Sequence, residues 1–401
     1  MYDVIKILII FAAILILINR KLNLGLAMII GAIGLALLYR LSLSNLGDVL
    51  LTTVTGYTGI QLILALGLIM IMENILRKTE TFKEMMAALK NVVSDVRIVL
   101  AAPPAIIGMV PSVGGAYFSA PLVEEASSTI SITPERKGFI NYWFRHIWEY
   151  VLPTYPGIIL ASALTGFPLD KLIVYQLPFA VMVILAGTLF CFRGINLANN
   201  TPLMVRRREN ILKLAISLLP IGVIILFVGV FRIDIAITMG IVIIALFIYH
   251  RYTFKKIVDT FRESMSWNIF LIIAGVIFFK EMLDATGSVD GISLFFKGTG
   301  FPLIILYFIL PFLVGILTGL TIAFVGATFP LLITMSGGSP DIGHMAFAFA
   351  SGFTGVMFSP VHMCFVLTGE YFKADRGVIY RYMIIPSSMV MLTAVVMWVV
   401  G

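Results

Sequence analysis

Charged residues are scarce in this sequence. Asp, Glu, Lys and Arg make up 12% of its 401 residues, and 60% are hydrophobic. Soluble domains contain roughly 25% charged residues, so this chain has too few to cover a surface in water. Apolar runs of membrane-spanning length recur throughout. We therefore interpret the chain as an integral membrane protein whose main surroundings are the lipid bilayer.

Cysteine and histidine are also rare, with two and four copies. Cys191 and Cys364 both lie in apolar runs, which argues against a disulfide framework, and no CxxC pair is present. Walker A, HExxH and GxSxG motifs are missing as well. We therefore predict no enzyme activity, no metal site and no cofactor beyond a coupling ion. The net charge of +7 sits in short loops, so membrane topology explains it without a nucleic-acid partner.

What the chain does contain is a repeated pattern of breaks. Pro104 and Gly108 head a glycine-rich apolar run, and Pro311 and Gly315 head another at the same offset of 207 (311−104 and 315−108). Proline-broken segments at matching positions of two halves are typical of secondary transporters. The pattern predicts a first membrane repeat at 1–195, a cytoplasmic linker at 196–210 and a second, inverted membrane repeat at 211–401.

The apolar segments predict an all-α polytopic protein without strands. They lie near 4–18, 24–42, 57–76, 98–130, 139–166 and 172–193, and again near 211–230, 233–250, 266–284, 301–335, 343–372 and 378–400. In each half, one segment is too long for one span and reads as a re-entrant hairpin, and another reads as a broken helix. The hairpin tips are predicted at 110–115 and 318–328. A lightly amphipathic loop at 77–97 suggests an interfacial helix.

Charge in the loops predicts the orientation. With the hairpins excluded, each half has about five spans, and this odd number makes the halves antiparallel. If the linker with Arg206–Arg208 is cytoplasmic, the cation-rich loops fall inside and both termini fall outside. An alternative in which each hairpin crosses fully loses this pattern. We expect a multi-pass protein of the cell (inner or cytoplasmic) membrane.

Broken helices predict the binding site. A break exposes unpaired N–H groups that suit a carboxylate or other anion, and carbonyl ends that suit Na⁺. We expect the two tips to meet the breaks at 153–156 and 359–362 near the midplane. The alternative is that the Gly, Ser and Thr residues at these positions only allow close packing between membrane helices. The candidate substrate-binding residues are Ser112, Gly114, Gly115, Thr154, Tyr155, Thr318, Thr321, Ser359 and His362.

Ionisable residues inside the apolar segments are candidates for ion coupling, because burying them is costly. Arg145 and Glu149 are spaced i,i+4 and could simply neutralise one another. His146 could carry a proton or bind substrate, or it could be a packing histidine. Glu124, in the second arm of the first hairpin, is a coupling candidate whose alternative is an interfacial position facing cytoplasmic water.

Four stretches resemble the ion-transporter superfamily: 103–126, 149–157, 315–331 and 355–363. That superfamily includes gluconate permeases, dicarboxylate and citrate carriers and arsenite permeases. The chain is most similar to a prokaryotic branch of integral membrane proteins grouped as a domain of unknown function. The resemblance implies an elevator-type carrier that is usually a homodimer. The Ser-Asn-Thr signature of the sodium/dicarboxylate members is missing; Pro111-Ser112-Val113 and Thr318-Gly319-Leu320 stand at the tips.

Together these features predict a secondary active transporter of a small organic anion, a carboxylate, coupled to H⁺ or Na⁺. Two alternatives stay open at this point. One is an efflux carrier for arsenite or another inorganic oxyanion. The other is a channel or a membrane scaffold without transport, although the sparse polar residues in the spans argue against a continuous pore.

Overall fold

The computed structural model describes residues 2–79, 81–90, 92, 95–111, 115–128, 130–193 and 207–400, and every element in these ranges is helical. The predicted all-α class is confirmed. The first half contains α1 (Tyr2–Asn19), α2 (Leu24–Tyr39), α3 (Leu43–Thr55), α4 (Tyr57–Lys78), α5 (Thr81–Lys90), α6 (Val96–Gly108), α7 (Ala116–Ala126), α8 (Pro134–Arg145), α9 (Pro156–Thr165) and α10 (Leu169–Cys191).

The second half contains the same kinds of element. They are α11 (Arg207–Ile224), the π-helix η1 (Ile225–Val230), α12 (Ile235–Tyr249), α13 (Phe254–Ser264), α14 (Trp267–Ala285), α15 (Ser288–Thr299), α16 (Leu303–Thr318), α17 (Thr321–Met335), α18 (Ile342–Met357), α19 (Met363–Phe372) and α20 (Arg376–Val400). α11 begins at Arg207, inside the predicted linker of 196–210, and residues 194–206 lie outside the described residues, so the linker stays a prediction.

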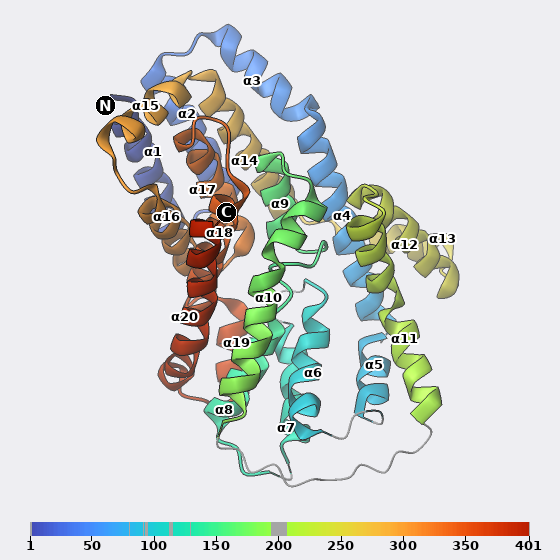
Figure 1. Cartoon of the computed structure of the whole chain (residues 1–401). Helices are drawn as coiled ribbons and strands as arrows, with labels where there is room; N and C mark the ends of the chain where they lie inside the picture. Colours follow the sequence, from blue (N-terminus) through green and yellow to red (C-terminus); the bar gives the residue numbers. More distant parts are fainter. Residues whose placement is uncertain are drawn as a thin grey trace.

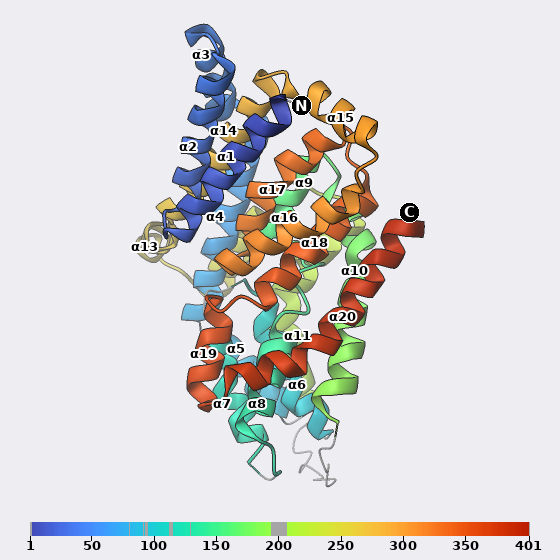
Figure 2. The ribbon, with the colours of Figure 1, turned by 90° about the vertical axis from the view of Figure 1, so that its left-hand side faces the viewer.

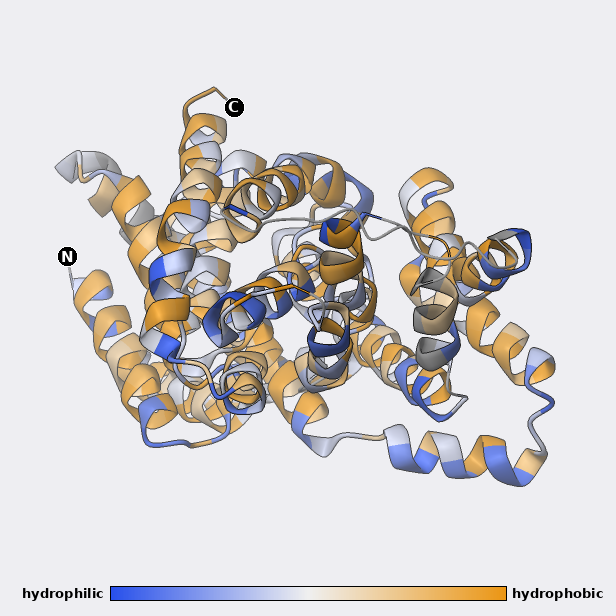
Figure 3. Cartoon of the chain, turned by 90° about the horizontal axis from the view of Figure 1, so that it is seen from below, coloured by the Kyte–Doolittle hydropathy of each residue, from blue (hydrophilic) through white to orange (hydrophobic). Residues whose placement is uncertain are grey.

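Several helices are long and apolar enough to cross a bilayer. Within the described ranges these are Tyr2–Asn19, Leu43–Lys78, Leu169–Cys191, Arg208–Val230 and Arg376–Val400, and the pair of α13 and α14, bent by 53°, is a further candidate. Their exposed side chains include large apolar ones: Val174 of α10 is 68% exposed and Val399 of α20 is 75% exposed. Figure 3 shows hydrophobic residues along most helices out to the periphery. The count of ten spans stays a prediction.

The two halves pack against each other through reciprocal contacts: where a helix of the first half contacts one of the second, their equivalents in the opposite halves also contact each other. α2 lies against α14 while α12 lies against α4, and α7 lies against α19 while α17 lies against α9. Within each half, α6 packs on α8 and α16 packs on α18, whereas α10 and α20 pair across the two halves. In Figures 1 and 2, α6 and α7 occupy the lower part of the molecule and α16 and α17 the upper part.

Matched glycines allow the closest of these contacts. A Cβ atom at Gly108 would lie 2.3 Å from the carbonyl oxygen of Arg145, and one at Gly315 would lie 2.2 Å from that of Gly352. No side chain can occupy such a position without moving backbone. The helices α6 and α16 therefore each approach the following broken helix through a glycine, which explains two of the residues that mark the offset of 207.

Proline and serine end the broken helices near the predicted positions. α18 ends at Met357 and α19 begins at Met363, in agreement with the break predicted at 359–362. The first break is longer than predicted, because α8 already ends at Arg145 and turns fill the chain up to Pro156, which occupies the first turn of α9.

The hairpin tips agree in part. α6 ends at Gly108 and α7 begins at Ala116, so residues 110, 111 and 115 of the predicted tip lie between helices, whereas 112–114 lie outside the described residues. The second predicted tip, 318–328, is wrong in extent. The turn consists of Gly319, at φ +64°, and Leu320, and α17 is helical from Thr321. Threonine and glycine within 321–328 are compatible with a helix whose faces are packed, and these faces are almost fully buried.

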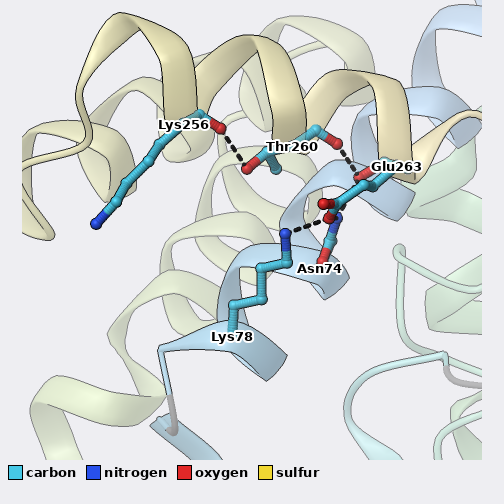
Figure 4. A network of polar contacts seen from close by, with 6 residues as sticks. Asn74, Lys78, Lys256, Thr260 and Glu263 are labelled. Carbon is cyan, nitrogen blue, oxygen red and sulfur yellow. Dashed lines mark hydrogen bonds and ion pairs between the residues drawn. The ribbon is translucent and has the colours of Figure 1, made fainter.

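Two short helices lie outside the long apolar segments. α5 confirms that loop 77–97 contains a helix; its interfacial location stays a prediction. α13 is strongly amphipathic and is tied to α4 by polar contacts (Figure 4). In that network Lys78 and Asn74 donate to the Glu263 carboxylate, and Asn74 also donates to the Ser264 hydroxyl at 3.0 Å.

Candidate functional site

The tip of the second hairpin meets both broken helices. Thr321, the first residue of α17, donates a hydrogen bond to the Glu149 carboxylate at 3.1 Å. On the other side, Nδ1 of His362 lies 2.6 Å from the carbonyl oxygen of Gly319. His362 in turn places its Nε2 atom 3.0 Å from Nε2 of His146. Residues from three segments, more than 170 positions apart in places, thus form one cluster.

The first hairpin is fastened to the first break through the last carbonyls of α6. Arg145 Nη1 donates to the Ile107 carbonyl at 3.3 Å, and the Tyr155 hydroxyl donates to the Gly108 carbonyl. Trp148 Nε1 donates to the Ala105 carbonyl at 2.7 Å. The final carbonyls of a helix lack partners within that helix, so Tyr155 and Trp148 supply partners for Gly108 and Ala105, while the Ile107 carbonyl also accepts from Val110 N at 3.3 Å.

Three helices begin at this cluster without a side-chain cap. The N-cap residues of α9, α17 and α19 are Tyr155, Leu320 and His362, and none of them accepts a capping hydrogen bond on its side chain. The hydroxyl of Thr154, just before α9, is fully buried and has no hydrogen-bond partner among the described residues. Unpaired N–H groups and a free hydroxyl are donors, and donors at helix N-termini favour an anion.

The other predicted substrate-binding residues differ in where they lie and in whether their hydroxyl groups already have hydrogen-bond partners. Ser359 is fully buried in the second break, and its hydroxyl accepts from Val361 N at 3.3 Å. The Thr318 hydroxyl donates to Val314 within its own helix at 2.7 Å, so its donor is already used. Gly115 is the N-cap of α7. Ser112 and Gly114 lie outside the described residues.

The ionisable candidates separate into two groups. Arg145, His146 and Glu149 are all buried. Arg145 and Glu149, spaced i,i+4, do not lie on one helix, because α8 ends at Arg145 and Glu149 lies in the following turn; that they neutralise one another stays a hypothesis. Glu124, by contrast, is half exposed and forms an ion pair with Lys137 at 2.8 Å, which favours the interfacial interpretation of this residue.

A third residue completes the histidine pair. The Cys364 thiol belongs to a group with His146 and His362 in which the ligand atoms all lie within 4.8 Å of one another. The sequence-based expectation of no metal site did not foresee this convergence, since the two histidines are 216 residues apart. A signal did exist: each histidine stands directly at the break of its broken helix.

A cavity with a volume of about 480 Å³ opens beside α9. It lies between α4, α9, α10 and the start of α12, and its polar rim includes Gln61 and Asp170. Arg232 forms an ion pair with Asp170 at 3.0 Å on this rim. The cavity thus lies beside the carboxyl-terminal end of α9, and the amino-terminal end of the same helix lies at the cluster.

The apolar helices fit a multi-pass membrane protein. Within that class, the chain belongs to the family described as protein of unknown function (DUF401), whose model matches residues 3–401. A search of curated proteins gave no match to this chain.

Proposed function

We propose that this protein is a secondary active transporter of a small organic anion, with a carboxylate as its recognised group. The observation that carries the proposal is the meeting of uncapped helix starts with the unpartnered Thr154 hydroxyl. Such donors bind an anion without a full positive charge, which would be costly to bury in a membrane.

The arrangement of the halves supports an alternating-access carrier built from two inverted repeats. Contacts between halves are exchanged, as in the pair of α2 with α14 and α12 with α4. The two hairpins lie toward opposite ends of the molecule (Figures 1 and 2). In transporters with inverted repeats, substrate sites form where such discontinuous helices meet. An elevator motion, in which hairpins and broken helices slide along the remaining helices as one unit, is part of the proposal.

The coupling ion in this proposal is H⁺ or Na⁺, and Glu149 distinguishes the two. It is a buried carboxylate whose partner, Thr321, belongs to the mobile hairpin of the proposed mechanism. If protons drive transport, Glu149 is the group that takes up a proton when the movement of the second hairpin removes its hydrogen bond from Thr321. If Na⁺ drives transport, the carbonyls at the helix ends supply its oxygen ligands.

Ligand-induced stabilisation tests the proposal most directly. The purified protein should melt at a higher temperature with its carboxylate substrate, and a panel of carboxylates, arsenite and other oxyanions identifies the class. Counterflow of the labelled hit into proteoliposomes then tests transport. Ser359→Ala should reduce both the melting shift and the counterflow. Thr334→Val is the control, because the Thr334 hydroxyl is buried at the far end of α17 and donates to the Pro330 carbonyl of the same helix, so both measurements should stay unchanged. Stabilisation by arsenite alone, or conductance at channel rates, would overturn the proposal.

A further inference from the structure

The cluster of His146, His362 and Cys364 has the composition and spacing of a metal site. Its two Nε2 atoms are 3.0 Å apart, and the Cys364 sulfur completes a group within 4.8 Å. Zn–N bonds of about 2.0–2.1 Å and Zn–S bonds of about 2.3 Å at tetrahedral angles place ligand atoms roughly 3.3–3.6 Å apart. A cation would therefore need shifts of only a few tenths of an ångström at the histidine pair.

The hydrogen bonds of the rings determine which nitrogen is free. Nδ1 of His146 lies 2.6 Å from the Tyr142 carbonyl oxygen, and Nδ1 of His362 lies 2.6 Å from that of Gly319. A carbonyl oxygen only accepts, so each Nδ1 carries the hydrogen. In the neutral rings each Nε2 atom then carries a lone pair, and the two lone pairs face each other. They repel unless a cation or an added proton lies between them.

This is also the outer arrangement that metal-binding histidines use. A ligating histidine usually donates its other ring N–H to a carbonyl or carboxylate, which fixes the ring and directs the free nitrogen at the metal. Here both rings are fixed in this way, and the Tyr142 ring packs on them with centroids 4.7 Å and 5.7 Å away. The site is therefore held in place by backbone and packing before any ion binds.

We propose that His146, His362 and Cys364 bind one borderline-soft transition-metal cation of the Zn²⁺ type. Two imidazoles and one thiolate suit such an ion, whereas Mg²⁺ and Ca²⁺ prefer oxygen ligands. Among the described residues, no other His, Cys, Asp or Glu joins the group, so a fourth position is left for an external ligand. Three protein ligands with one open position are typical of zinc sites that do more than hold a fold together. The inference does not depend on transport.

Metal binding to the purified full chain tests the inference. After chelation and desalting, Zn²⁺ would be titrated against a chelating dye, and we expect one ion per chain. Cys364→Ser and His362→Ala should each weaken binding by at least about 100-fold, beyond the 10–100-fold that loss of an outer partner costs. The affinity should also fall at low pH, because the ligands must lose their protons.

The chain supplies its own controls. Cys191→Ser and His344→Ala change the other buried cysteine and a histidine outside the group, and Zn²⁺ affinity should stay unchanged in both. Co²⁺ gives a second readout, since its thiolate charge-transfer band should appear in wild type and in Cys191→Ser but not in Cys364→Ser. Melting of the metal-free variants checks that they fold. If wild type binds Zn²⁺ no more tightly than Cys364→Ser, or if Co²⁺ shows no thiolate band, the inference is wrong and the two histidines share a proton instead.

Discussion

The two broken helices use the same backbone plan with different side chains. Tyr155 and His362 stand 207 residues apart as N-caps of α9 and α19, and each side chain contacts a carbonyl of the hairpin in its own half, at Gly108 and Gly319. The first break also carries buried Arg145 and Glu149, whereas the second carries no Asp, Glu, Lys or Arg.

This difference separates what positions the site from what gives it chemistry. The glycine contacts and helix ends recur in both halves, so they define the shape of the site. The charges and the histidine–cysteine group do not recur, so in the proposed carrier they are the features that distinguish the two ends of a polar substrate. A ligand with one anionic end and one neutral end fits such an asymmetric centre better than a symmetric one does.

The largest expected effect comes from the glycines that the halves share. Gly108→Ala and Gly315→Ala each place a methyl group against a backbone carbonyl, which cannot rotate away, so each should destabilise the protein by about 3 kcal/mol, the upper end for overpacking. Melting in detergent would measure this. Gly240→Ala, where nothing lies within 4 Å, is the matched control and should be neutral or slightly stabilising. A loss at Gly108 without one at Gly315 would break the equivalence of the halves.

The next effect concerns the charge that is unique to the first break. Glu149→Gln should reduce uptake driven by a pH gradient at least about tenfold, because an amide cannot take up a proton. Exchange of substrate across the membrane should persist. Uptake and counterflow in proteoliposomes measure the two activities. If wild-type uptake instead follows a Na⁺ gradient and ignores pH between about 5.5 and 8, Glu149 has a structural role and the first break is not the coupling site.

A smaller effect is expected where the two halves touch. Thr321→Val removes the hydroxyl that donates to Glu149, a charge-assisted hydrogen bond of about 1.5–3 kcal/mol. Because this bond is made without substrate, the melting temperature of the substrate-free variant should fall, and substrate-induced stabilisation should correspond to an affinity about tenfold weaker. Thr334→Val on the same helix serves as the control. Equal behaviour of the two variants would remove Thr321 from the site.

The smallest effect concerns the polar contact of α13 with α4. The equivalent contact in the other half, between α3 and α14, has no ion pair among its described residues. Lys78 and Asn74 donate to Glu263 and hold the pKa of its carboxyl below the ordinary value of 4.5. A lowered pKa stabilises the fold at neutral pH, and this contribution disappears as the pH falls through the lowered value. Glu263→Gln should therefore lower the melting temperature slightly at pH 7 and low salt, and this difference should shrink as the pH falls through the lowered pKa or as salt is added.

Much of the fold followed from proline and glycine. Pro156 and Pro360 break apolar segments, and Gly108 and Gly315 permit close packing, so the broken helices and hairpins could be placed within a few residues. Thr321 was assigned to a tip although it begins α17, because threonine and glycine signal a turn or a packed helix equally well without tertiary context.

The site was less predictable because its contacts join distant parts of the chain. Thr321 and His362 were chosen as site residues, and the structure places both at the cluster, but their partners Glu149 and His146 could not be assigned from spacing. Cys364 gave no signal, since a lone cysteine in an apolar run is usually a packing residue. The docking of the second hairpin onto the first break brings Thr321 to Glu149, and the approach of the two broken helices brings His362 and Cys364 to His146.

The contact of Thr321 with Glu149 also has a consequence for biosynthesis. The carboxylate emerges from the ribosome 172 residues before its hydroxyl partner, and His146 emerges 216 residues before His362. During this interval, the Glu149 carboxylate and the Nε2 atom of His146 lack the partners that they have in the complete structure. The centre can therefore be completed only after the second hairpin and the second broken helix have been made.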